Sequence, residues 1–149
     1  MTVRWLIASL HLLALGLGLG AILDRAWSLR GNLDDAGLRR VFRADNLWAL
    51  AALLWLSTGL LRAFAGLEKG SAYYLGSHVF WLKMALFLTV FGLELTPMIG
   101  LIGWRARRRR GQALDTSRAA AYARISLIQA LLIVLILFVA TALARGVGA

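Results

Sequence analysis

The sequence predicts an all-α protein, a four-helix transmembrane bundle that forms a single membrane domain over residues 1–149. Hydrophobic residues make up 60% of the 149 residues, and the mean hydropathy is +0.74. Soluble domains are only about 45–50% apolar. The excess is gathered in four long apolar blocks separated by charged segments, which is the pattern of repeated membrane crossing.

The four predicted helices cover about residues 4–24, 45–63, 78–104 and 124–144, and residues 25–45 are expected to form a polar loop with a short interfacial helix near Asp34. The first block exceeds the apolar region of a signal peptide, about 7–15 residues, so we expect it to be retained. Its pair Gly16 and Gly20 would let another helix approach closely. Because residues 125–144 also lack charge, a homo-oligomer is one expectation.

Lysine and arginine are distributed unevenly among the connecting segments. Twelve of the 17 lie within residues 25–43 and 105–124, whereas the opposite side of the bundle carries Arg4, Arg62, Lys69 and Arg145. By the positive-inside rule, the basic loops face the cytoplasm and both termini face outward. The net charge of +10 is then explained by topology and by anionic lipid. Membrane lipid, and not nucleic acid, is therefore the expected partner of the basic surface.

Tryptophans mark the expected membrane interfaces, where their amphipathic rings are enriched. Those near predicted helix ends are Trp5, Trp27, Trp48, Trp81 and Trp104. Trp55 lies inside the second block, so we expect it to pack within the bundle.

The candidate functional residues are ionisable side chains inside the apolar blocks, because such groups are costly in a membrane. They are His11, Lys83 and Glu94, with His78 at a helix entrance. Each also has a structural interpretation. His11 can pack inside, Lys83 can extend to the interface, and His78 can be interfacial. Imidazole is nevertheless a common ligand of haem and copper, so His11 is also a candidate metal ligand.

Helix geometry relates these residues to one another. Lys83 and Glu94 are eleven residues apart and fall on one face of their helix. Because the first and third helices run in the same direction, His11 and Lys83 should lie at one level near the outer surface. Glu94 should lie deeper, where we expect it to pair with Arg25 or Arg43.

Several chemistries are excluded by what the sequence lacks. There is no cysteine, which excludes disulfides and thiolate sites, and two histidines cannot form a three-histidine metal centre. The sequence also contains no phosphate-binding loop, nucleophile elbow or HExxH motif.

Several short runs of residues carry a resemblance to known proteins. They are Arg4–Leu6, Leu10–Ala14, Leu38–Phe42, Ala44–Asn46, Gly66–Gly70, Tyr73–Leu75 and His78–Met84. Through them the chain resembles, over nearly its whole length, a bacterial family of predicted integral membrane proteins of unknown function. The resemblance implies a multi-pass protein of the bacterial cytoplasmic (inner) membrane.

A more distant resemblance rests on the first helix and the third. Leu10–Leu13 contains an early histidine, and His78–Lys83 forms a tryptophan- and lysine-containing helix entrance. In these features the chain is similar to HemJ-type protoporphyrinogen oxidases and CopD-type copper-resistance membrane proteins. The HemJ resemblance implies a haem b with His11 as axial ligand and Lys83 beside the porphyrin, and it makes His78 a further cofactor-binding candidate.

Two functional hypotheses follow from these residues. In the first, the protein is a haem-b redox membrane protein with His11 as ligand. In the second, it is a non-enzymatic scaffold or a small transporter-like bundle, in which His11, Lys83, Glu94 and Arg25 form internal polar pairs. Copper handling is a third possibility, although only three methionines could supply thioether ligands.

Overall fold

The computed structural model describes residues 2–65 and 71–147 of the chain. Its elements are α1 (Thr2–Arg30), α2 (Asp35–Phe64), α3 (Ser71–Gly76), α4 (His78–Arg109) and α5 (Ala119–Ala144). No strand occurs within the described ranges. The four long helices are each long and apolar enough to cross a membrane. The expected all-α, four-helix architecture is confirmed.

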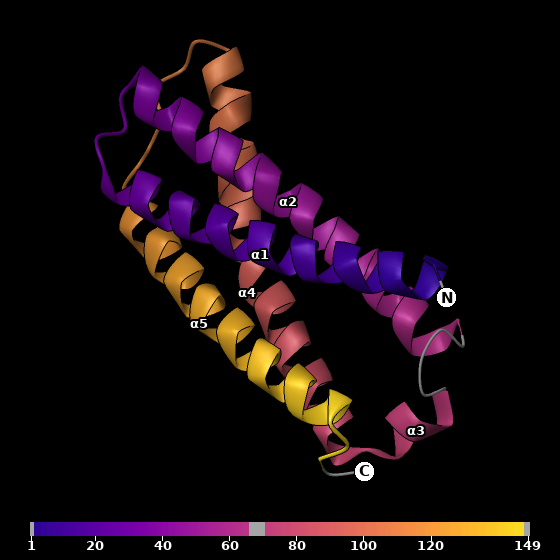
Figure 1. The fold of residues 1–149 in the computed structure, drawn as a ribbon. Helices are drawn as coiled ribbons and strands as arrows, with labels where there is room; N and C mark the ends of the chain where they lie inside the picture. Colours follow the sequence, from indigo (N-terminus) through magenta and orange to yellow (C-terminus); the bar gives the residue numbers. More distant parts are fainter. Residues whose placement is uncertain (1, 66–70, 148–149) are drawn as a thin grey trace.

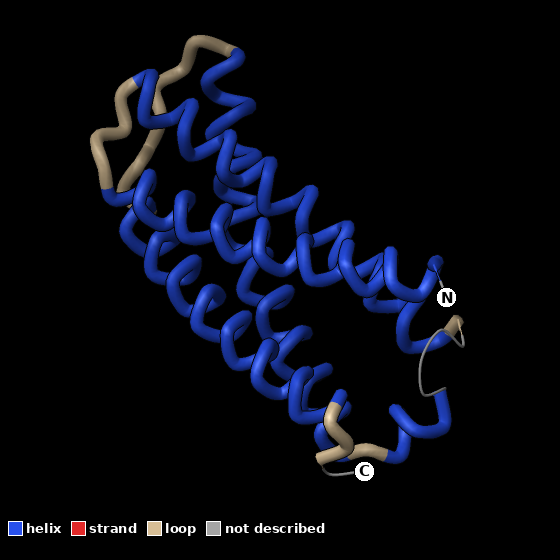
Figure 2. The backbone as a smooth tube through the Cα atoms, in the orientation of Figure 1, coloured by secondary structure: helices blue, strands red, loops and turns tan. Residues whose placement is uncertain are grey.

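The long helices form an antiparallel bundle. α1 packs along both α2 and α5, and α5 packs along α4, whereas α2 and α4 make little backbone contact. Both termini and α3 lie at one end, which we call the terminal end (Figure 1). The α1–α2 and α4–α5 connections lie at the opposite end, which we call the basic end because residues 107–110 are all arginine. Loops are confined to these two ends (Figure 2).

The helices extend beyond the predicted bounds. α1 continues past residue 24 to Arg30, and α2 already begins at Asp35, so the predicted loop over residues 25–45 is wrong. The expected interfacial helix is instead the first turn of α2. Its N-cap, Asp34, accepts a hydrogen bond from the Gly37 amide at 2.8 Å. Gly37 suits this tight turn, since a Cβ there would overlap the carbonyl of Asn32.

The other connections between the long helices are also shorter than predicted. α4 continues past residue 104 to Arg109, and α5 begins at Ala119 rather than near residue 124. Between the second and third predicted helices, residues 64–77 include the last residue of α2 and the short helix α3. Residues 66–70, one of the runs that carry the family resemblance, lie outside the described residues.

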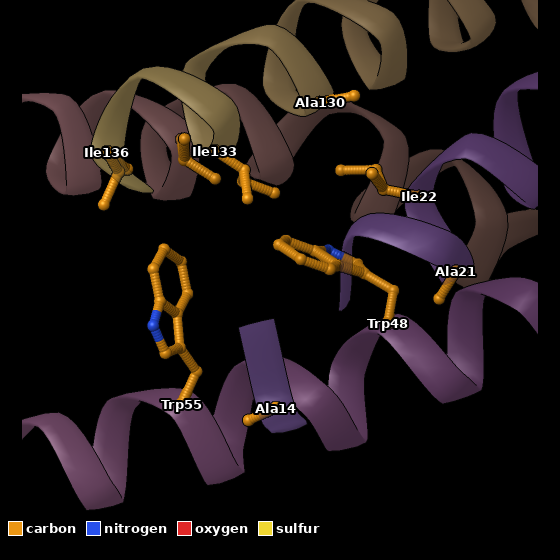
Figure 3. Packing of buried hydrophobic residues seen from close by; sticks show 9 residues of the cluster. Ala14, Ala21, Ile22, Trp48, Trp55, Ala130, Ile133 and Ile136 are labelled. Carbon is orange, nitrogen blue, oxygen red and sulfur yellow. The ribbon is translucent and has the colours of Figure 1, made fainter. Parts of the chain in front are cut away.

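The apolar core is centred on tryptophans of α2. Trp48 and Trp55 project from α2 toward Ile133 and Ile136 of α5 (Figure 3). Trp55 is 5% exposed, which confirms its expected packing inside the bundle. Trp48 was expected at an interface, but it is 3% exposed because α2 begins three turns before it.

The other four tryptophans also divide into exposed and buried residues. Trp5, Trp27 and Trp81 are exposed, as interfacial residues are, whereas Trp104 is buried because α4 continues beyond it.

The close approach of α1 to α2 uses a different glycine from the predicted pair. A Cβ on Gly18 would lie 3.2 Å from the Trp48 ring, whereas a Cβ on Gly16 or Gly20 would meet nothing within 4 Å. Within the described residues, Gly16 and Gly20 thus make no close contact with another helix. Their role in a homo-oligomer stays a prediction.

Candidate functional site

A buried polar network joins all four long helices toward the basic end. Arg25 of α1 is fully buried, and its Nη1 donates to Oδ1 of Asp45 in α2 at 2.8 Å. Nη1 and Nη2 also donate to the two carboxylate oxygens of Glu94 in α4, at 2.7 and 2.8 Å. On α5, Ser126 accepts from Nε at 3.0 Å and Gln129 accepts from Nη2 at 3.1 Å. Each of the five N–H groups of the guanidinium thus has an acceptor.

The charges in this Arg25 network are balanced. Arg105 of α4 donates to Oδ2 of Asp45 at 2.9 Å, so that two arginines face two carboxylates. The amide of Gln129 donates to Glu94 at 2.9 Å and to the Val90 carbonyl at 3.0 Å. Across the described parts of the chain, every buried side-chain nitrogen and oxygen has a hydrogen-bond partner. Buried charges persist in proteins when they are paired and hydrogen-bonded in this way.

Sequence reasoning anticipated only part of this network. Arg25 does meet Glu94, but Arg43 does not join them: it is exposed, and the described hydrogen bonds to Glu94 come from Arg25 and Gln129. Asp45 was missed because it was assigned to the end of a loop. Gln129 was missed because it carries no charge, although an amide in the middle of an apolar helix is itself a signal.

A cavity of about 270 Å³ lies toward the terminal end of the bundle. All four long helices line it, together with Tyr74 of α3. Most of the lining is aliphatic or aromatic, and the polar and charged groups include His11, Arg62 and Lys83. The two residues that were expected to share an outer level, His11 and Lys83, therefore line one cavity.

The His11 side chain forms a hydrogen bond with a residue of α2. Its Nδ1 lies 2.9 Å from Oγ1 of Thr58, whose hydroxyl also donates to the Leu54 carbonyl at 2.6 Å. Because that bond uses the single hydroxyl hydrogen, Thr58 accepts from His11. We therefore assign a proton to Nδ1 of His11. Gly59 permits this approach, since a Cβ there would lie 3.2 Å from Cε1 of His11.

Lys83 lies in the second turn of α4 and is half-buried. Its ammonium lies 5.2 Å from the centre of the Phe80 ring, within the range of a cation–π interaction. His78 lies in the first turn, after the N-cap Ser77, where it is exposed and absent from the cavity lining. The structure therefore does not bring His78 to the cavity that His11 and Lys83 share.

The chain matches a family model described as "Predicted membrane protein (DUF2214)" over residues 3–148. The chain belongs to this family. No curated protein and no solved structure matches it. As a DUF2214 member, the chain is a predicted membrane protein with several spans, in agreement with its four long apolar helices. The resemblance to HemJ-type and CopD-type proteins stays a prediction.

Proposed function

We propose that this DUF2214 protein binds a small membrane-soluble molecule in the cavity toward its terminal end. One observation carries the proposal: His11 and Lys83, from different helices, line a single apolar cavity. Lysine in a membrane-spanning helix is costly and marks a candidate functional site by default. An aliphatic residue at position 83 would avoid that cost. An apolar cavity with a few convergent polar groups is the usual form of a small-molecule site.

The Arg25 network is a less suitable ligand site than the cavity. Arg25 is 0% exposed, and protein acceptors already use its five N–H groups. A ligand would have to break these bonds before it gained any of its own. The network and the cavity thus have separate roles, one in holding the helices together and the other in binding.

The proposal is tested by filling the cavity. Ala140 of α5 lines it, and Leu131 lies on the exposed face of the same helix. In native mass spectrometry of gently purified protein, we expect wild type to carry a small molecule of defined mass. Ala140→Trp should lower its occupancy about tenfold or more, because the indole takes its space, whereas Leu131→Trp should leave it unchanged.

Two outcomes of the same measurement would contradict the proposal. One is a wild-type protein that retains no small molecule, and the other is equal occupancy in Ala140→Trp and Leu131→Trp. Either would favour the alternative of a membrane scaffold whose internal polar pairs serve stability alone.

Haem b is a second candidate ligand, favoured by the hydrogen bond of His11 to Thr58. A hydrogen bond from one ring nitrogen commonly supports a histidine that binds a metal through the other. His11 would hold the iron, and Lys83 would pair with a porphyrin carboxylate. When bound, the haem would supply one-electron chemistry.

The size of the cavity places haem second. Its volume of about 270 Å³ lies below the about 300–1,000 Å³ of typical drug-sized sites, so a porphyrin would require α2 and α4 to separate. The absorbance spectrum of protein purified from haem-replete cells is decisive. A Soret band that His11→Ala abolishes would support haem b, and a colourless protein would exclude it.

A further inference from the structure

A hollow of about 200 Å³, which we call the basic hollow, lies at the basic end between α4, α5 and the segment that connects them. α4 ends shortly before Gly111, which adopts a positive φ of 67°, and the chain then turns back toward α5 (Figure 1). This return brings Asp115 and Arg118 beside residues of the last turns of α4. The basic hollow and the cavity that contains His11 lie at opposite ends of the bundle, so they are separate features.

The hydroxyl of Tyr122 is a hydrogen-bond donor that the protein leaves unused in the basic hollow. Tyr122 lines the hollow and is only 4% exposed, and its ring lies 5.7 Å from that of Trp104. Among the described residues, none accepts from the phenol, and no fully buried side-chain oxygen lacks a partner. The phenol oxygen therefore belongs to the small part of Tyr122 that stays accessible. The indole N–H of Trp104, another lining residue, likewise has no acceptor among the described hydrogen bonds.

The charged groups of the basic hollow carry a net positive charge. Arg107, in the last turn of α4, and Arg118, the residue before α5, both line it and are exposed. Asp115 is the acidic residue of the described lining, and it accepts a hydrogen bond from the Ser117 amide at 3.0 Å. Hydrogen bonds from Ser117, and then the charges of Arg107 and Arg118, hold the pKa of Asp115 below its ordinary value. Two guanidinium groups thus lie near one carboxylate that already has a donor.

This combination of groups suits a phosphate. Guanidinium groups bind phosphate oxygens through two parallel hydrogen bonds, and a phenol and an indole can donate to the same acceptor. A basic pocket between membrane-spanning helices on the cytoplasmic side is typical of sites for anionic lipid head groups.

An apolar side of α4 leads from the basic hollow toward the middle of the membrane. Ile99, Gly103 and Arg107 follow one another at intervals of four residues, so they are neighbours along one side of the helix. Ile99 is 66% exposed, and a Cβ on Gly103 would meet nothing within 4 Å. Ile99 lies about 12 Å deeper than Arg107 along the helix axis. A molecule with a phosphate at Arg107 can therefore extend a hydrocarbon chain past Gly103 onto Ile99.

We propose that the basic hollow binds the head group of an anionic phospholipid. Arg107 and Arg118 contact its phosphate, the Tyr122 hydroxyl donates to it, and one acyl chain lies along Gly103 and Ile99. The orientation predicted from the basic loops favours this occupant, because the cytoplasmic leaflet is rich in anionic lipids. This site goes beyond the proposed function and does not depend on the cavity toward the terminal end.

Titration of the delipidated full chain with dioleoyl phosphatidylglycerol, followed by native mass spectrometry in detergent, tests this inference. The first equivalent should bind about tenfold more tightly than dioleoyl phosphatidylethanolamine, whose head group has no net charge. Arg107→Gln and Arg118→Gln should each weaken binding of phosphatidylglycerol about five- to tenfold. Arg109→Gln is the matched control, since Arg109 is exposed, belongs to the same run of arginines and lies outside the described lining. It should change binding by no more than about twofold, because salt screens an exposed charge at a distance.

Two further comparisons test the hydroxyl and the acyl chain. Tyr122→Phe removes only the hydroxyl and should weaken binding of phosphatidylglycerol about threefold. Gly103→Leu should weaken it by about as much or more, because the new side chain occupies the path of the acyl chain. Gly92→Leu is the matched control in the same helix, since Gly92 is also exposed and a Cβ there would meet nothing within 4 Å.

Three outcomes would overturn the inference. If Arg107→Gln and Arg109→Gln weaken binding equally, general charge at the basic end holds the lipid and the hollow does not. If phosphatidylglycerol and phosphatidylethanolamine bind equally, the anionic head is wrong. If glycerol 1-phosphate, which has no acyl chain, binds as tightly as the lipid, the occupant is a soluble phosphate. None of these outcomes bears on the proposed cavity ligand, because the two sites lie at opposite ends of the bundle.

Discussion

Arg25 is a charged residue that no solvent reaches, in a helix that is otherwise largely apolar. The desolvation of such a group costs several kcal/mol when it is unpaired. Five hydrogen bonds to side chains of α2, α4 and α5 offset that cost. Because those acceptors come from three other helices, they also fix the rotation of each helix about its axis. In a membrane, where apolar faces resemble the lipid, polar contacts of this kind specify the packing.

The first prediction concerns this residue. Arg25→Met should lower the free energy of unfolding by about 3–5 kcal/mol, because it leaves two carboxylates without their shared cation. Equilibrium unfolding in mixed micelles with increasing SDS measures the loss. Adding Glu94→Gln to Arg25→Met should recover part of it.

Arg43→Met is the matched control, since Arg43 is exposed. It should change the free energy of unfolding by no more than about 0.5 kcal/mol. Equal losses in Arg25→Met and Arg43→Met would show that the network has no special role in stability.

At this scale the sequence predicted pairs of charges better than it predicted their surroundings. Helical spacing and depth were enough to bring Glu94 to Arg25, since both quantities follow from residue numbers alone. Asp45 was missed because a carboxylate beside arginines looks like part of a polar loop until its partner is known. Gln129 was missed because a neutral amide contributes nothing to a search for charge.

The ends of the helices show the same limitation at the level of elements. Predicted bounds stopped at residue 24 and restarted at residue 45 because hydropathy treats Arg25 and Asp45 as polar. In the structure, Nη1 of Arg25 lies 2.8 Å from Oδ1 of Asp45. Arg25 lies inside α1 and Asp45 lies inside α2. Hydropathy cannot distinguish a charge that is paired across a bundle from one that water solvates, which is why the connection appeared longer than it is.

The contact between α4 and α5 gives a prediction at this scale. A Cβ on Gly100 would overlap the phenol of Tyr122, whereas a Cβ on Gly103 would meet nothing within 4 Å. Gly100→Ala should therefore lower stability by about 1–3 kcal/mol, as overpacking does. Gly103→Ala should be neutral or stabilising by up to about 1 kcal/mol.

Thermal unfolding followed by circular dichroism measures both variants. The two glycines lie in the same helix, so the gain in helix propensity is common to both and their difference reports the contact. Adding Tyr122→Phe to Gly100→Ala should restore part of the loss, because it removes the overlapping hydroxyl. Equal melting temperatures for Gly100→Ala and Gly103→Ala would contradict this account of the α4–α5 packing.

On the scale of the whole molecule, the two ends of the bundle differ in the contacts that join their helices. Ion pairs and hydrogen bonds link the four helices toward the basic end, and Arg108 adds a bond to Asp35 at the surface. Toward the terminal end, α2 and α4 line the cavity between them. A cavity that binds a ligand requires helices that can adjust, and the ion pairs at the opposite end would keep such adjustment local. The sequence predicted the number and directions of the helices, but not this division, which depends on which faces meet.

The last prediction concerns the orientation of the bundle in the membrane. The chain has no cysteine, so Ala72→Cys in α3 and Ala113→Cys between α4 and α5, both at exposed positions, provide unique labelling sites. Because twelve of the 17 lysines and arginines lie within residues 25–43 and 105–124, the basic end should face the cytoplasm. In intact cells a membrane-impermeant maleimide should label Ala72→Cys, and it should label Ala113→Cys only after permeabilisation.

The opposite labelling pattern would reverse the bundle and carry a consequence for the site. The cavity lies toward the terminal end, so the predicted orientation places it in the outer leaflet. A reversed bundle would instead place the cavity in the cytoplasmic leaflet, which is rich in anionic lipids. The labelling result thus decides which leaflet can supply a ligand to the cavity.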